Sequence, residues 1–184
     1  MNNSRGGFAI LSVAALVSLA VGQHSSMPPG MSHEEHLKQM NQDAELKKRG
    51  VLAMRFDQDK ASHHFYLTEA GGIIEVGVNE TTDAETLRQV RDHLRTISQQ
   101  FAEGVFASPV ATHAEMPPGA PVMRERKARI KYRYTETPAG AQVVISTADR
   151  KALSAVHDFL KYQIRKHRTG DPISAGPTRN VDHN

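Results

Sequence analysis

The sequence contains no cysteine in its 184 residues. Disulfide bonds and thiolate metal sites are therefore excluded, and any metal ion must be held by histidine, methionine or carboxylate side chains. Enzyme signatures are also missing, since there is neither a Gly-x-Ser-x-Gly turn nor a glycine-rich phosphate-binding loop. The net charge of +3 is too balanced to predict nucleic-acid binding. These absences favour a binding protein over an enzyme.

Long apolar runs are missing as well, because a helix that crosses a bilayer needs about 20 apolar residues. The longest run, residues 8–21, contains two serines and follows a short polar start with Arg5. Small residues at Ala20 and Gly22 complete the three-part pattern of a cleavable signal peptide. We therefore predict cleavage before Gln23, no membrane span in the remaining chain, and export to the periplasm or the extracellular space.

Hydrophobic periodicity beyond the signal peptide predicts a mixture of helices and strands. The first helix should begin at a capping box of Ser32 and Glu35, and Gly50 is expected to end it. The other expected elements are strands at 51–57, 63–67, 73–78, 130–134 and 143–145, helices at 83–103 and 149–166, and a long loop at 104–127. The predicted parts are a signal peptide (1–22), a mobile His/Met segment with a short helix (23–50), an α+β domain (51–168) and a disordered tail (169–184).

A repeated order of strand, strand and helix is the most informative architectural pattern. Residues 65–69 correspond to 132–136, and residues 90–94 correspond to 156–160. Because neither half can bury its apolar face alone, we expect one antiparallel sheet with two helices on one face, an α+β fold. The other face would be polar and could form a homodimer. Its expected residues are Arg55, His64, Tyr66, Glu75, Lys131 and Arg133.

Histidine and methionine gather directly after the signal peptide. The members of this first set are His24, Met27, Met31, His33, His36 and Met40. On a helix, the spacing of His33, His36 and Met40 places them on one face. Imidazole and thioether suit copper, above all Cu(I), because soft sulfur selects it, and His24 beside a new amino terminus could hold Cu(II). The alternative is a polar, mobile segment in which these residues cluster by chance.

A second set lies in the long loop and consists of His113, Met116 and Met123. Residues 116–119 repeat the Met-Pro-Pro-Gly of residues 27–30, and each copy has a further methionine and a histidine nearby. The repetition argues against chance and makes these residues a second candidate set of metal ligands, but Pro-Pro-Gly is itself a good rigid turn, and the pattern favours that simpler interpretation.

Two histidines of the expected domain complete the candidate metal ligands. His63 shares a strand face with Phe65, and His157 lies on the apolar stripe of the last helix. The two could meet if that helix crosses the strand, and a buried pair could bind metal or make structural hydrogen bonds. His167 continues the stripe but lies about 15 Å further along the helix than His157, too far for one ion to bridge both.

Several segments together resemble a family of small uncharacterised bacterial proteins. They are residues 55–60, the His-His-Phe at 63–65, residues 130–134, His-Asp-Phe-Leu-Lys-Tyr-Gln-Ile at 157–164 and His-Arg-Thr-Gly-Asp at 167–171. Some members are labelled aspartate carbamoyltransferase, but this chain lacks the Ser-Thr-Arg-Thr phosphate loop of that enzyme. The resemblance therefore implies a shared domain over residues 51–171, without an activity.

The sequence thus predicts an exported metal-binding protein, with copper as the ion, that acts in sequestration or transfer. The alternative is a non-enzymatic interaction or dimerisation module that uses the polar face of the sheet.

Overall fold

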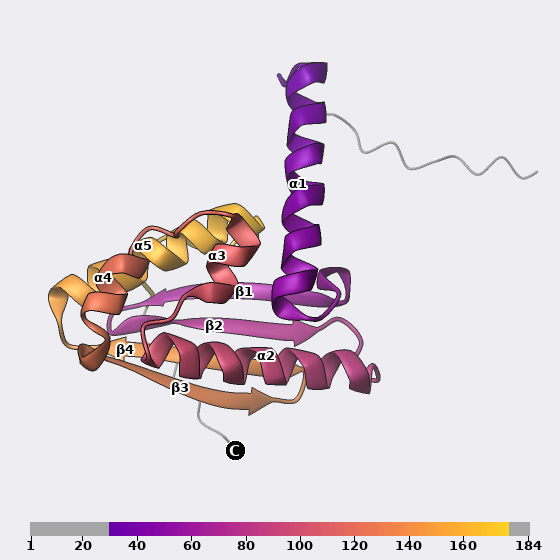
Figure 1. Ribbon diagram of the computed structural model, residues 1–184. Coiled ribbons are helices and arrows are strands. Elements are labelled where there is room, and N and C mark those ends of the chain that lie inside the picture. Colours follow the sequence, from indigo (N-terminus) through magenta and orange to yellow (C-terminus); the bar gives the residue numbers. More distant parts are fainter. Residues whose placement is uncertain (1–29, 177–184) are drawn as a thin grey trace, which may run out of the picture.

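The computed structural model describes residues 30–176 (Figure 1). The predicted signal peptide, together with His24 and Met27, lies outside the described residues. The helices are α1 (His33–Met54), α2 (Ala84–Ala102), α3 (Ala107–His113), α4 (Ala120–Glu125) and α5 (Arg150–His167), with 3₁₀ turns at Gln58–Lys60 and Lys127–Arg129. The strands are β1 (Ala61–Thr68), β2 (Gly71–Val78), β3 (Ile130–Thr137) and β4 (Gly140–Thr147).

The strands form one antiparallel sheet in the order β1-β2-β4-β3. Phe65, Ile74 and Val143 lie opposite one another across three strands, and all three belong to the hydrophobic core. The helices α2 and α5 pack on this face of the sheet, as Figure 1 shows. The predicted α+β fold is confirmed, and its core lies between the sheet and these two helices.

The other face of the sheet carries no helix among residues 30–176 (Figure 1). His64 pairs with Glu75 in register, and Lys131 and Arg133 are exposed on β3. Arg55 was predicted on this face but lies outside the sheet, because it ends α1 with a left-handed φ of 63°.

The expected strand at 51–57 is wrong, because α1 continues through Gly50 to Met54. Gly50 is buried inside the helix, and a Cβ there would lie 1.9 Å from Nε2 of Gln58. The glycine therefore allows a close contact and does not end the helix. The alternation of apolar residues reflects only the burial of Met54 and Phe56, since Leu52 is 75% exposed.

The expected long loop contains α3 and α4 and so is largely helical. Beyond α5, Asp171 and Gly176 bond the predicted tail to the outer edge of β1: Phe65 N donates to Asp171 Oδ2 (2.9 Å) and Gly176 N donates to Leu67 O (3.0 Å). These bonds satisfy backbone groups that an edge strand would otherwise present to another chain. Within the described residues, no helix has the length and apolar character needed to cross a membrane.

Candidate functional site: a histidine-lined cavity

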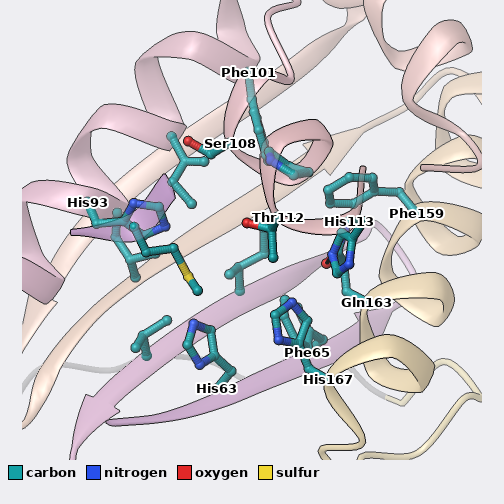
Figure 2. A pocket seen from close by; sticks show the side chains of 16 residues that line it. His63, Phe65, His93, Phe101, Ser108, Thr112, His113, Phe159, Gln163 and His167 are labelled. Atoms are coloured by element: carbon teal, nitrogen blue, oxygen red, sulfur yellow. Dashed lines mark hydrogen bonds between the residues drawn. The ribbon is translucent and has the colours of Figure 1, made fainter. Parts of the chain in front are cut away.

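Four histidines from four different elements surround a cavity of about 40 Å³ between the sheet and the helices. They are His63 of β1, His93 of α2, His113 of α3 and His167 of α5. Figure 2 shows His93 on one side, His113 on the other, and His63 and His167 between them. A cavity of this size has room for an ion or a few water molecules. The site therefore depends on tertiary packing, since no two of its histidines share an element.

Ordinary periodicity explains why each ring points inward. Strand alternation places His63 on the same face as Phe65, towards the helices. In α2, His93 is three residues beyond Val90, and in α5, His167 is three residues beyond Ile164, so both extend buried stripes. His113 ends the short helix α3 and is only 7% exposed.

The rings of His63, His167 and His113 form a continuous row. The ring centroids of His63 and His167 are 5.2 Å apart with nearly parallel planes, at 14°. His167 and His113 are 5.1 Å apart and nearly perpendicular, at 79°. His93 stands on the other side of Phe56, whose ring is 5.7 Å from it and 5.9 Å from His63. Three of the four imidazoles are therefore immediate neighbours.

Two buried ring nitrogens in this row have no hydrogen-bond partner in the described part of the chain, Nε2 of His63 and Nδ1 of His113. The opposite nitrogen of His113, Nε2, lies 2.9 Å from Oε1 of Gln163. An amide oxygen can only accept a hydrogen bond, so Nε2 of His113 carries the proton and Nδ1 of the same ring keeps its lone pair. Buried polar atoms are normally bonded, so these two nitrogens mark an unsatisfied site.

Burial keeps the histidines of the cavity neutral. It lowers the pKa of His63 to about 4, with a smaller effect of His64 in the same direction. Burial first, and the neighbouring His63 second, lower the pKa of His93 and of His167 to about 3. The pKa of His113 is also lowered, mainly by burial. At neutral pH each ring therefore has a free lone pair, the form in which imidazole binds a metal.

The rest of the lining is apolar except for a few neutral groups. Met54, 6% exposed, places its thioether side chain in the wall. Ser108, Thr112 and Gln163 are the other polar residues, and no carboxylate lines the cavity within residues 30–176. As the rings stand, no three His, Asp or Glu side chains of the described segment converge on one point closely enough to hold an ion.

The first predicted set lies apart from this cavity. His33 and Met40 are exposed on α1, while Met31 and His36 are partly buried. The first turns of α1 project away from the sheet and the other helices, as Figure 1 shows. The structure thus places the described members of the first set along one projecting segment, and none of them lines the cavity.

The second set is not brought together. His113 lines the cavity, Met123 is fully buried in the hydrophobic core, and Met116 is 43% exposed beside Arg124. The pairing of His63 with His157 is also wrong. His157 Nε2 lies 2.9 Å from the carbonyl oxygen of Thr68, at the far end of β1 from His63. The last helix crosses the strand so that its end, and hence His167, meets His63.

Sequence reasoning missed His93, His167 and Met54 as members of one site. The stripe of α2 contained a signal for His93, which lies four residues before the buried Ile97. Met54 was assigned to a strand, which gave its side chain the wrong surroundings. For His167, only the crossing of α5 over β1 brings it to His63, and the sequence does not specify that crossing.

Comparison with known proteins adds no identity, because no family model, curated protein or solved structure matches this chain. The resemblance based on the histidine-bearing segments stays a prediction.

Proposed function

We propose that this chain is an exported protein that binds a copper ion in the histidine-lined cavity, for sequestration or transfer. The observation that carries the proposal is the row of His63, His167 and His113, neutral and with two unpartnered buried nitrogens. Export remains part of the proposal and is supported by the pattern of residues 1–22.

The spacing of the rings supports an ion between them. Two imidazoles bound to one tetrahedral ion, at metal–nitrogen distances of about 2.0–2.1 Å, have ring centres about 5 Å apart. The two neighbouring pairs are 5.2 and 5.1 Å apart, so their backbones need little movement. The rings must turn, because His63 and His167 now present faces to each other. Rotation about the bond to an imidazole ring has a broad energy minimum, which makes that turn inexpensive.

Titration of the purified exported protein with copper tests the proposal. We expect one ion bound more tightly than about micromolar, and at least about a tenfold loss for His63→Asn and for His167→Gln. Matched controls are His157→Gln and His64→Gln, histidines outside the cavity that bond to Thr68 and Asp171. Equal losses in the controls, or no binding by the wild type, would show that the cavity is not a copper site.

Residues 31–40 are a second candidate copper site, and a separate variant tests them. Replacement of all His and Met between residues 24 and 40 should leave one ion bound in the cavity, since none of the described members of the first set lines it. If this variant binds no copper, the predicted N-terminal site is right and the cavity site is wrong.

A second candidate function, dimerisation, is favoured by the sheet face that no described helix covers. Lys131 and Arg133 are exposed there on the edge strand β3. A sedimentation experiment without metal tests it. A dimer that survives Lys131→Glu/Arg133→Glu would exclude this face as the interface.

A further inference from the structure

We infer that the cavity selects a monovalent soft cation, Cu⁺ or its chemical equivalent Ag⁺, over divalent Cu²⁺ and Zn²⁺. The inference rests on the proposed function and names the class of ion that the site takes. It follows from the charge, the donor atoms and the walls of the cavity.

The charge of the lining sets the first constraint. Imidazole, thioether, hydroxyl and amide groups are all neutral, and no carboxylate of the described residues faces the cavity. The cost of moving an ion from water into an apolar interior rises steeply with its charge, and only a paired counter-charge offsets it. A neutral site therefore penalises a divalent ion far more than a monovalent one.

Glu115 and Asp171, two carboxylates beside the row of rings, do not supply that counter-charge, because each already pairs with other groups. Glu115 accepts from the hydroxyl of Tyr162 (2.6 Å) and pairs with Lys166 (2.9 Å), on the outer side of His113. Asp171 is held at the edge of β1 by His64 and the amide of Phe65. After burial, which is the main cause, Lys166 and Arg49 lower the pKa of His113 and Glu115 raises it, so the charges near that ring do not provide a net attraction for a divalent ion.

The donor atoms set the second constraint. Met54 is the methionine of the cavity wall, and its buried thioether is a soft ligand that favours Cu⁺. Around it the wall is aromatic and aliphatic. The largest of these residues are Phe65, Phe101, Phe159, Ile74, Leu94 and Ile97. Such walls leave little room for the additional water ligands that Cu²⁺ and Zn²⁺ usually keep in sites with few protein ligands, whereas Cu⁺ and Ag⁺ need few ligands.

His113 provides one connection from the cavity to the surface. It lines both the cavity and a broad surface groove between α1 and α5, whose walls include Asp43, Arg49 and Lys166. An ion that enters from this groove therefore meets His113 first. Among the described residues, His113 is the one histidine placed in both spaces.

The test uses Met54→Leu, which removes the sulfur and nearly conserves the volume, with Met123→Leu as the matched control. Met123 is also buried, but it belongs to α4 and does not line the cavity. Both are made in the variant without His and Met at 24–40, and thermal melts confirm that they fold. Cu⁺ is titrated without oxygen against a chromophoric Cu⁺ chelator, and Ag⁺, Zn²⁺ and Cu²⁺ by calorimetry.

We expect Cu⁺ and Ag⁺ to bind at least about 100-fold more tightly than Zn²⁺ and Cu²⁺, with about a tenfold loss of monovalent affinity in Met54→Leu alone. The inference is overturned if a divalent ion binds as tightly as Cu⁺, or if the two methionine variants behave alike. Divalent binding that His63→Asn abolishes would overturn only the charge selectivity and would keep a metal-binding function. Absence of binding by every ion would overturn both.

Discussion

The histidine-lined cavity and the projecting part of α1 contain the same kinds of side chain in opposite surroundings. In the cavity, imidazoles from four elements are held together by the core, and burial lowers their pKa. On α1, His33 and Met40 are exposed and share only a helix face. The difference teaches that clustering in sequence is a weaker guide to a metal site than convergence in the fold, because a site must be preorganised.

The largest expected effect is a difference between the two regions in how much they contribute to stability. Phe159 packs against Phe101 in a T-shaped contact and is 1% exposed, so Phe159→Ala should cost about 3–5 kcal/mol of unfolding free energy. Leu37 of α1 is 47% exposed, so Leu37→Ala should change it by less than about 0.5 kcal/mol. Urea unfolding measures both. Similar losses would mean that the projecting helix is part of the cooperative core.

Ion binding should stabilise the fold through the cavity. At a free Ag⁺ concentration about 100 times the dissociation constant, we expect about 2.7 kcal/mol of added stability, visible as a higher Tm. The variant without His and Met at 24–40 should show the same shift. A shift that disappears in that variant would locate the ion on the N-terminal segment.

The apo protein should lose stability as the pH falls from about 6.5 towards 4. The folded pKa of His63 is about 4, below the 6.5 of the free side chain, so the unfolded chain binds more protons in this window. His93 and His167 extend the effect to lower pH, since their pKa is about 3. The free energy of unfolding should therefore fall by at least about 1 kcal/mol between pH 6.5 and pH 4.5. Urea unfolding across this range, with a flatter slope in His63→Asn, checks the sign.

The smallest expected effect concerns the attachment of α1. Arg168 forms two hydrogen bonds with Asp43, at 2.9 and 3.0 Å, between largely exposed side chains. Because exposed pairs contribute little, Arg168→Ala should cost less than about 1 kcal/mol. Hydrogen exchange should quicken in residues 33–48 and stay unchanged in α2. Weaker copper binding by this variant would show that the two regions cooperate.

Much of the fold could be predicted, because the alternation at 63–67 and the stripe of α2 report local periodicity directly. The end of α1 could not, since Gly50 is required by the close approach of the Gln58 side chain, which the hydrophobic pattern does not reveal. The site was predictable only in part. His63 and His113 were predicted as candidate ligands, but His167 becomes their neighbour only because α5 crosses β1. Met54 was missed because residues 51–57 were predicted to be a strand.

The most direct test of the central claim is a two-dimensional NMR spectrum of the histidine side chains with Ag⁺, a diamagnetic ion that couples to directly bound nitrogen. We expect silver–nitrogen couplings at His167 and at one of its two ring neighbours, His63 or His113, and none at His33 or His36. Couplings confined to His24, His33 and His36, with unchanged resonances in the cavity, would contradict it.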